Sequence, residues 1–217
     1  MKLSYGITVH NEHEELNQLL ELLIHNTDQE DEIVIVDDFS NQETQDVIDS
    51  WVQQYSDKKV IKVFQRKLDG DFASQKNFVI EQCSGDFIFH IDADEYPNVI
   101  LLQQLKQILE INEVDLLWIP RVNTVEGMTD EDIQTWGWKV SEQGWVNYPD
   151  YQSRVFRRTD SIRWERPLHE LIKGAKTYSH LPPHEELSLY HPKTIEKQTQ
   201  QNMFYNQNFS RELNSRT

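Results

Sequence analysis

Hydrophobic residues along the first half of the chain alternate between two spacings. Short continuous apolar runs rich in β-branched residues predict buried strands, and apolar residues three and four apart predict amphipathic helices. The predicted strands cover residues 3–9, 31–40, 59–65, 86–94 and 115–122. The predicted helices between them cover residues 11–26, 44–55, 71–85 and 97–112. Strands separated by helices imply right-handed β-α-β units, so we expect an α/β fold with a mainly parallel sheet flanked by helices.

Several residues predict where the helices begin and end. Asn11 is a candidate N-cap, Gly85 a C-terminal stop, and Pro97 fits the first turn of the fourth helix. Ser40 and Glu43 have the spacing of a capping box before the second helix.

The second half of the chain has a different pattern. Residues 123–152 form a long irregular segment with clustered aromatic residues, which are Trp136, Trp138, Trp145, Tyr148 and Tyr151. Short strand-like runs follow, and the polar tail predicts a helix. With no repeat and no convincing linker, we expect a single domain over residues 1–217, with a nucleotide-sugar-binding half at 1–122 and an acceptor-binding half at 123–217.

Charge and composition limit the range of possible functions. The chain of 217 residues has 21 basic and 37 acidic residues and a net charge of −16, which argues against a nucleic-acid partner. Cys83 is the single cysteine, so no intrachain disulfide is expected, and its apolar surroundings favour a buried thiol. The sequence has neither a signal-peptide pattern nor an apolar run that would span a membrane. We expect a cytoplasmic protein without an integral membrane segment.

Polar residues follow three of the predicted strands. They are His10-Asn11-Glu12, Asp37-Asp38 and Asp92-Ala93-Asp94. Ligands of parallel α/β sheets bind at the carboxyl ends of the strands, so these groups are candidates for one site.

The strongest chemical signal is the pair Asp92 and Asp94 at the end of an apolar strand. Mg²⁺ and Mn²⁺ prefer carboxylate oxygens and often complete their shell with substrate phosphates. A solvated acidic turn is the alternative, and it is the commoner explanation of an isolated D-x-D. The preceding apolar run and the parallel-sheet context favour a metal-diphosphate site. Glu95 directly follows. It would either bind the metal through water or cap the next helix, and we favour the cap.

The other candidate residues are weaker when taken singly. Asp38 is placed to bind a base or ribose, although a turn or capping acid is an equal alternative. Neither a G-x-G-x-x-G nor a G-K-[ST] loop is present, which disfavours dinucleotide-binding and P-loop proteins. Glu170 is a candidate general base, with His169 beside it, and His191 is a candidate metal ligand. A lone histidine is more often structural.

Taken in order, these motifs resemble family 2 glycosyltransferases with the type-A, Rossmann-like fold. The chain reads "ITVHNE", "IVDDFS" and "GDFIFHIDADE", where the family pattern is P-x-Y-N-E, V-D-D-G-S and G-D-Y-I-x-x-L-D-A-D-D. The resemblance is strong over residues 3–122. The later "RVFRR", "HE" and "H" are similar to a branch related to lipopolysaccharide-core glucosyltransferases.

The resemblance implies a role for each matching residue. Nucleotide-sugar binding is implied for Thr8, His10, Glu12, Asp38, Lys76, Asp92 and Ala93. Metal binding is implied for Asp94, with His191 completing the site and Asp92 approaching both the metal and the ribose. Glu170 is implied as the catalytic base. Departures at Thr8, His10, Phe39 and Phe78 from the common residues put the identity of the donor in doubt.

The hypothesis is an inverting, metal-dependent glycosyltransferase. It would move a sugar from a nucleoside diphosphate, with UDP favoured, to a hydroxyl of a glycan or other acceptor, in glycan or lipopolysaccharide-type synthesis. Its cofactor would be Mn²⁺ or Mg²⁺, and aromatic residues of the 136–151 loop would stack on sugars or pack as a lid. Two alternatives remain: a catalytically inactive carbohydrate-binding protein on the same fold, and a haloacid-dehalogenase-type phosphatase. In that phosphatase the D-x-D motif usually follows the first strand, whereas here it follows the fourth.

Overall fold

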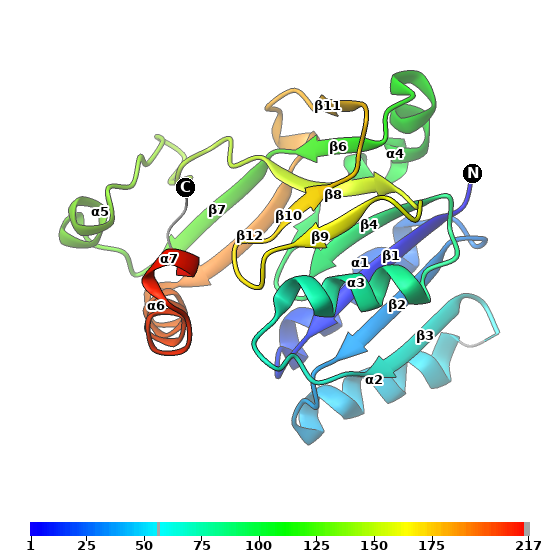
Figure 1. Cartoon of the computed structure of the whole chain (residues 1–217), viewed down its shortest axis with the longest axis horizontal. Coiled ribbons are helices and arrows are strands. Elements are labelled where there is room, and N and C mark those ends of the chain that lie inside the picture. The colour runs from blue at the N-terminus through cyan, green and yellow to red at the C-terminus, as the bar shows by residue number, and fades with distance from the viewer. Residues whose placement is uncertain (56, 215–217) are drawn as a thin grey trace.

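A computed structural model describes residues 1–55 and 57–214. Its centre is a sheet in the order β11-β6-β8-β4-β1-β2-β3 (Figure 1). The strands of this sheet are β1 (Leu3–Val9), β2 (Glu32–Asp37), β3 (Val60–Gln65), β4 (Phe87–Asp92), β6 (Leu116–Ile119), β8 (Gln152–Arg157) and β11 (Tyr178–His180). The predicted α/β fold is confirmed. The sheet is mainly parallel, as expected, and β8 is the exception because it runs antiparallel to both β4 and β6.

Helices cover both faces of the sheet. These are α1 (His13–Asn26), α2 (Gln42–Tyr55), α3 (Phe72–Gln82) and α4 (Val99–Asn112). Buried leucines of α1 and α4 share one core with Leu3, Tyr5 and Ile7 of β1. Residues of α3 pack on the opposite face, against Val34 and Val36 of β2. The alternation of side chains along each strand therefore supplies two separate cores.

Smaller elements extend from one end of the sheet. A second sheet joins β5 (Tyr96–Pro97), β12 (Leu189–Thr194) and β7 (Arg121–Glu126), and a hairpin joins β9 (Arg163–Glu165) to β10 (Leu171–Lys173). The helices α5 (Asp130–Trp136), α6 (Ile195–Asn208) and α7 (Arg211–Asn214) lie on the side of β7 and β12 (Figure 1). The predicted tail helix is therefore present, and the predicted irregular segment contains α5. Across the described ranges, the structure has no helix both long and apolar enough to cross a membrane.

Proline changes two of the predicted boundaries. The strand expected at 115–122 is broken at Pro120. The part before this proline is β6 of the central sheet, and the part after it is β7 of the second sheet. Pro97 lies in β5 rather than in a helical turn. The helix after it begins at Val99, with the Asn98 side chain accepting a hydrogen bond from the Ile100 backbone.

Three other cap predictions are wrong. Asn11 has a positive φ of 67°, and α1 begins two residues later without a side-chain cap. Asn41, rather than Ser40, caps α2, because its side chain accepts hydrogen bonds from Thr44. Helix α3 ends at Gln82, and Gly85 serves a close approach instead. A Cβ on Gly85 would lie 2.7 Å from the backbone nitrogen of Ser4.

Buried polar groups tie the amino ends of the strands together. Glu32, at the start of β2, is fully buried and accepts hydrogen bonds from the Ser4 and Ser84 hydroxyls and from Lys62. Burial raises the pKa of Glu32, but hydrogen bonds from Ser4, Ser84 and Lys62 outweigh it and hold the value at about 2, against 4.5 for the free side chain. Cys83 lies nearby, buried as predicted, and burial raises the pKa of its thiol to about 12.

We expect Glu32 to make folding stability depend on pH. Its pKa is lower in the folded chain, so its contribution is complete above pH 4.5 and is lost as the pH falls towards 2. Replacing Glu32 by Gln should lower the free energy of unfolding by about 3 kcal/mol at pH 7 and flatten its pH dependence across this window. Urea unfolding between pH 2 and 7 measures both. The exposed Glu30→Gln variant is the control, and equal curves for the two variants would contradict the assignment.

Candidate functional site

A cavity of about 520 Å³ lies at the carboxyl ends of the central strands. Every site residue expected from the sequence lines it: Thr8, His10, Glu12, Asp38, Lys76, Asp92, Ala93, Asp94, Glu170 and His191. These residues come from β1, β4, α3 and β12 or from the segments that follow β1, β2, β4 and β9. The parallel strands therefore bring together side chains that are far apart in the sequence, as the strand-end rule predicts.

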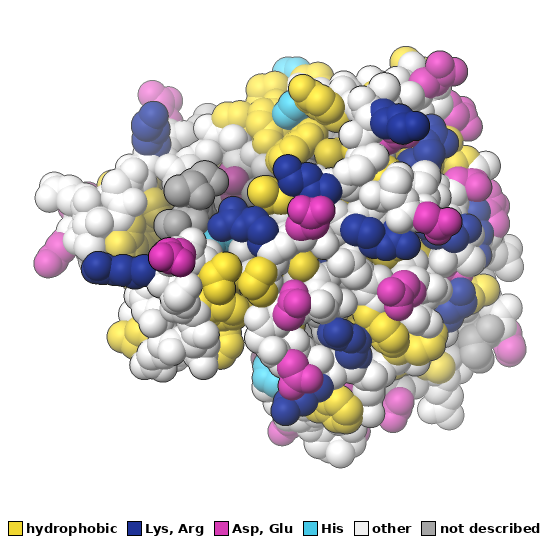
Figure 2. Space-filling model, in the orientation of Figure 1, with side chains coloured by type: hydrophobic (Ala, Val, Ile, Leu, Met, Phe, Trp, Pro, Cys, Tyr) yellow, Lys and Arg dark blue, Asp and Glu magenta, His cyan; other side chains and the backbone are white. Residues whose placement is uncertain are grey.

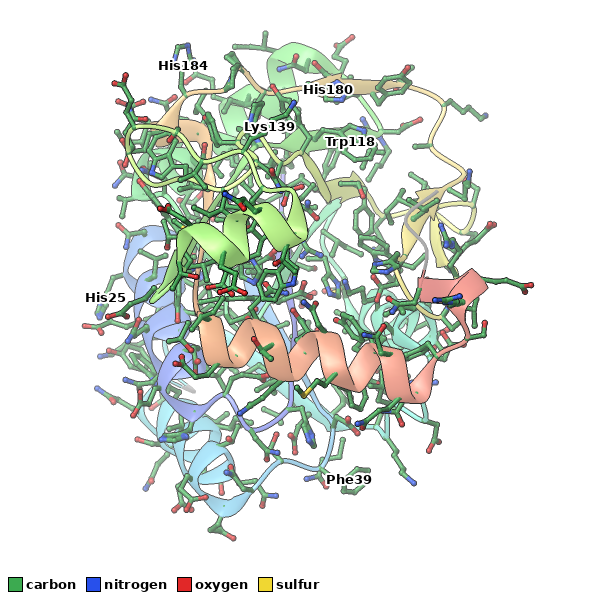
Figure 3. The ribbon with its side chains drawn as sticks, turned by 90° about the vertical axis from the view of Figure 1, so that its left-hand side faces the viewer. His25, Phe39, Trp118, Lys139, His180 and His184 are labelled. Atoms are coloured by element: carbon green, nitrogen blue, oxygen red, sulfur yellow. The ribbon has the colours of Figure 1, made fainter. Side chains whose placement is uncertain are left out.

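One end of the cavity is formed by the residues after β1 and β2. The His10 Nδ1 atom lies 2.8 Å from the carbonyl oxygen of Asp38, and Asn11 Nδ2 lies 3.0 Å from His10 Nε2. Asp38 Oδ1 accepts a hydrogen bond of 2.9 Å from the backbone nitrogen of Leu68. The carboxylate of the neighbouring Asp37 accepts hydrogen bonds from the Ser40 backbone nitrogen and the Gln65 side chain. Phe39 points outward with 59% of its surface exposed (Figure 3).

Asp92, at the end of β4, is paired with cations of the protein. Its carboxylate accepts a hydrogen bond from Arg154 Nη2, and its Oδ1 lies 3.4 Å from Lys76 Nζ. Burial raises the pKa of Asp92, but Arg154 and then Lys76 hold it well below its usual range. Thr8 Oγ1 completes the surroundings at 3.5 Å. Asp92 is therefore an ionised carboxylate whose two oxygens already have partners.

Lys76 connects Asp92 to Glu170. Its Nζ lies 3.6 Å from Glu170 Oε2 and 4.8 Å from the centre of the Trp164 ring. The side chain is only 7% exposed, so its charge acts on these carboxylates with little screening by solvent. Lys76 thereby holds Glu170 at the cavity wall next to Asp92.

Asp94 faces His191 across the cavity. Its Oδ2 lies 3.5 Å from His191 Nε2 and 3.6 Å from Lys197 Nζ. The other ring nitrogen, Nδ1, lies 2.9 Å from the side-chain oxygen of Asn123. An amide oxygen accepts only, so Nδ1 donates its proton to Asn123, and Nε2 is the ring atom next to Asp94. Burial lowers the pKa of His191, against the hydrogen bond with Asp94, which raises it.

The donor set of Asp94 and His191 fits a divalent cation that also binds a diphosphate. A carboxylate oxygen and an imidazole nitrogen are ligands that Mn²⁺ and Zn²⁺ accept, and substrate oxygens complete such shells. Among residues 1–55 and 57–214 the structure has no group of three or more His, Cys, Asp or Glu side chains arranged to hold a metal. The third expected ligand, Asp92, is turned to Arg154 and Lys76 instead.

Glu95 does not cap a helix, contrary to expectation. It is fully buried and accepts hydrogen bonds of 2.7 Å from Arg121 Nη1 and 2.6 Å from Arg154 Nη2. Arg121 also binds Asp150, with its Nη2 lying 2.6 Å from Oδ2. Asp92 and Glu95 are tolerated at the strand end because the buried guanidinium of Arg154 pairs with both and the partly buried one of Arg121 pairs with Glu95.

This ion network connects the two aspartates of the D-x-D motif. Asn123 Nδ2 donates to Asp150 Oδ2 at 2.9 Å, and the same Asn123 side chain contacts His191. The connected side chains, in order, are Asp94, His191, Asn123, Asp150, Arg121, Glu95, Arg154 and Asp92. Both aspartates are thus oriented by one chain of contacts, most of whose members line the cavity.

The pKa of Glu12 is shifted towards neutrality. Burial raises this pKa, the hydrogen bond from His10 N lowers it and the Asp94 carboxylate raises it, which gives a value of about 7. Its Oε2 accepts that hydrogen bond at 2.6 Å. Lys197 also acts on it and lowers its pKa. Glu12 therefore contacts His10 and is also within the electrostatic reach of Asp94.

Sequence reasoning missed several residues of the cavity. The wall also includes Trp118, Arg121, Arg154, Trp164, Arg166 and Lys193. Of these, Arg154 could have been found from the sequence, because an arginine interrupts the apolar strand "SRVF" that the sheet buries. Such a buried charge requires a partner, which is the Asp92–Glu95 pair.

The aromatic loop contributes less to the cavity than expected. Of its aromatic residues, Tyr151 lines the cavity, whereas Trp136 packs on Trp138 and Trp145 packs on Tyr148. His169 lines the cavity with a positive φ of 54°, and its Nε2 lies 3.3 Å from the Asn214 carbonyl. Among the described residues, Asp94 is ion-paired with His191 and Lys197 and not with His169.

Comparison with known proteins identifies the family. The model of the family described as Glycosyl transferase family 2 matches residues 4–191. The glycosyltransferase SunS of Bacillus subtilis is 23% identical over 195 residues, which are 87% of this chain and 39% of that protein. The poly(ribitol-phosphate) beta-N-acetylglucosaminyltransferase TarS of Staphylococcus aureus is 28% identical over 122 residues, which are 55% of this chain and 21% of TarS.

The fold agrees with this result. A crystal structure of residues 1–349 of S. aureus TarS in complex with UDP-GlcNAc aligns with a TM-score of 0.64 at 21% identity, covering 89% of this chain and 59% of that one. The chain thus spans less than two thirds of the length of the relatives it matches. It belongs to glycosyltransferase family 2, and it has the type-A fold.

Proposed function

We propose that the cavity binds a nucleoside-diphosphate sugar, with UDP as the nucleotide, and that the sugar is transferred with inversion to an acceptor hydroxyl. The observation that carries the proposal is the placement of Asp94, His191 and Glu170 around one cavity that also contains His10 and Asp38. Solved structures of TarS with UDP-GlcNAc and with UDP support the choice of donor.

The sheet suggests how the donor lies. Base and ribose would occupy the end with His10 and Asp38, next to β1 and β2, and the diphosphate would reach Asp94 after β4. Asp94 and His191 would hold a divalent cation there. Such a cation supplies positive charge that stabilises the departing diphosphate. Lys193, which also lines the cavity, adds a positive charge of the protein at the same place.

Glu170 would accept the proton of the attacking hydroxyl. A carboxylate at the cavity wall can take this proton while the hydroxyl approaches the anomeric carbon from the side opposite the diphosphate. Lys76 fixes Glu170 relative to Asp92 and so relative to the donor. The geometry requires no covalent intermediate, which is consistent with inversion.

The division of labour along the chain is part of the proposal. Residues 1–122 would bind the nucleotide sugar and residues 123–217 the acceptor, which is a glycan or another hydroxyl compound. A role in lipopolysaccharide-type synthesis and a cytoplasmic location stay predictions from the sequence.

Asp94 gives a test of the cation site. Replacing Asp94 by Asn should weaken UDP binding in Mn²⁺ about tenfold or more, because the variant loses the charged ligand next to His191. Isothermal titration with and without EDTA measures this. In EDTA the wild type should approach the affinity of the variant. Asp115→Asn, far from the cavity beside Arg157, is the control with unchanged affinity. Equal UDP affinity of Asp94→Asn and wild type in Mn²⁺ would contradict the assignment.

The donor class is tested by thermal shift. UDP-sugars, GDP-sugars and CMP-sugars are each added to the wild-type protein with Mn²⁺. A ligand at one hundred times its dissociation constant stabilises the folded state by about 2.7 kcal/mol, which raises the melting temperature by several degrees. We expect this rise with UDP-sugars. A panel in which no nucleotide sugar changes the melting temperature would refute the proposed function.

A further inference from the structure

A cluster of aromatic rings extends from the cavity across the far edge of the sheet. We define the aromatic platform as Trp118, Tyr151, Tyr178 and His180. We infer that this platform is an acceptor subsite that stacks on a pyranose ring, and that the acceptor is a neutral saccharide of more than one residue. The inference rests on the proposed function, since it names the acceptor class of that site.

The rings of the platform form one connected surface. Trp118 and His180 are stacked, with ring centres 5.6 Å apart and planes at 12°. Tyr151 and Tyr178 meet the same imidazole edge-on, at 5.0 Å and 6.0 Å. Trp118 and His180 project together from the upper part of the molecule (Figure 3). Tyr151 is held in place because its hydroxyl donates to the Leu181 carbonyl at 2.8 Å.

The platform is both exposed and continuous with the cavity. Trp118 and Tyr151 line the cavity wall, whereas 67% of Tyr178 is exposed on the edge strand β11. On the face drawn in Figure 2, hydrophobic side chains and histidine gather over β11 and β6. A ligand that leaves the cavity along this wall therefore meets aromatic faces first.

The order of the strands places the platform on the acceptor side. The proposed nucleotide end lies at β2 and β1, and Asp92 lies on β4. Beyond β4, Tyr151 directly precedes β8, Trp118 lies on β6, and Tyr178 and His180 lie on β11. Neighbouring strands are roughly 4.8 Å apart, so β6 and β11 lie about 10 Å and 14 Å from β4. This separation exceeds one sugar ring, so the platform would bind a ring beyond the one that carries the reacting hydroxyl.

The chemistry of the platform favours a saccharide over other occupants. Each member combines a flat ring face with a polar edge, as tyrosine, tryptophan and histidine do, and none is aliphatic. Such faces suit the C–H side of a pyranose, and the polar edges suit its hydroxyls. A polyanionic acceptor is disfavoured by the net charge of −16.

The test uses ligand-observed saturation-transfer NMR with defined probes. Cellobiose, cellotetraose, maltose, maltotetraose and methyl glucoside are each added to the full chain with UDP and Mg²⁺. We expect the tetrasaccharide of at least one series to bind more tightly than the methyl glucoside. Trp118→Ala and Tyr178→Ala should weaken that binding by roughly twofold to tenfold, the range for one aromatic contact.

Controls separate this inference from the proposed function. Tyr55→Ala removes an aromatic ring stacked on Trp51, away from the cavity, and should leave saccharide binding unchanged. Trp118→Phe keeps a ring and should retain most of the affinity, and Tyr178→Ala is the variant least disturbing to folding because Tyr178 is exposed. UDP titration of every variant shows whether the donor site persists.

Two outcomes would overturn the inference. In the first, wild type binds UDP but none of the saccharides. In the second, the saccharides bind equally to Trp118→Ala, Tyr178→Ala and wild type. Absence of binding of any nucleotide or nucleotide sugar would instead refute the proposed function.

Discussion

Replacing Glu170 by Gln is expected to lower the rate of sugar transfer about a thousandfold, while UDP binding stays near its wild-type value. General-base catalysis contributes roughly 10²–10⁴ in rate, and glutamine cannot accept the proton of the attacking hydroxyl. The side chain keeps its size beside Lys76, so the cavity should retain its shape. Steady-state kinetics with a saturating donor measures the loss in kcat, and titration of UDP measures binding.

A nearby glutamate offers the matched control. Glu165 lies in the hairpin strand β9, is exposed, and is not a wall residue of the cavity. Glu165→Gln should retain full activity. If Glu170→Gln transferred sugar as fast as Glu165→Gln, the general base would have to be another group.

Replacing Arg154 by Met is expected to lower the free energy of unfolding by about 3–5 kcal/mol. The change leaves the carboxylates of Asp92 and Glu95 buried with fewer partners, and breaking a buried ion pair from one side costs about this much. Total stabilities of about 5–15 kcal/mol make this a large fraction. Urea unfolding followed by circular dichroism measures the change.

Arg157, on the same strand, is the control that separates the loss of a buried ion pair from the loss of a positive charge. It pairs with Asp115 near the surface and is 41% exposed. Arg157→Met should cost about 1 kcal/mol or less, since exposed ion pairs contribute little. Equal unfolding midpoints for the two variants would show that the buried network does not stabilise the fold.

The order of strands and helices in residues 1–112 could be predicted because each apolar run is long and regular. Ile33–Val36 is continuously apolar, as a strand covered on both faces requires, and the leucines of α1 recur at helical spacing. The position of the strand ends then brought Asp38, Asp92 and Asp94 to one edge before any side-chain contact was known.

The partners of these residues could not be predicted, because they depend on strands that are distant in sequence. Arg154 reaches Asp92 only because β8 inserts antiparallel beside β4, a pairing that the alternation of elements did not indicate. Glu95 looked like a helix cap for the same reason, since its arginine partners lie on β7 and β8. Local spacing carries no information about such contacts.

The second half of the chain was the less predictable part. Its strands are short, such as β9, β10 and β11, and the break at Pro120 moves β7 into another sheet. The platform residues Trp118 and His180 come together through the pairing of β6 with β11. Local spacing along the chain did not indicate this pairing.

Membership of glycosyltransferase family 2 removes the phosphatase alternative. It agrees with the position of the D-x-D motif after β4 rather than after the first strand. The proposal gives each residue one role. Asp94 and His191 would hold the cation that binds the donor diphosphate, and Glu170 would accept the proton of the acceptor hydroxyl.

The most direct measurement is the release of nucleoside diphosphate from a panel of UDP-sugars and GDP-sugars in Mn²⁺, by wild type, Asp94→Asn and Glu165→Gln. The account predicts that wild type and Glu165→Gln release UDP from at least one UDP-sugar, faster when a saccharide acceptor is present, and that Asp94→Asn is slower by about tenfold or more. Release at equal rates by wild type and Asp94→Asn, or no release from any nucleotide sugar, would contradict it.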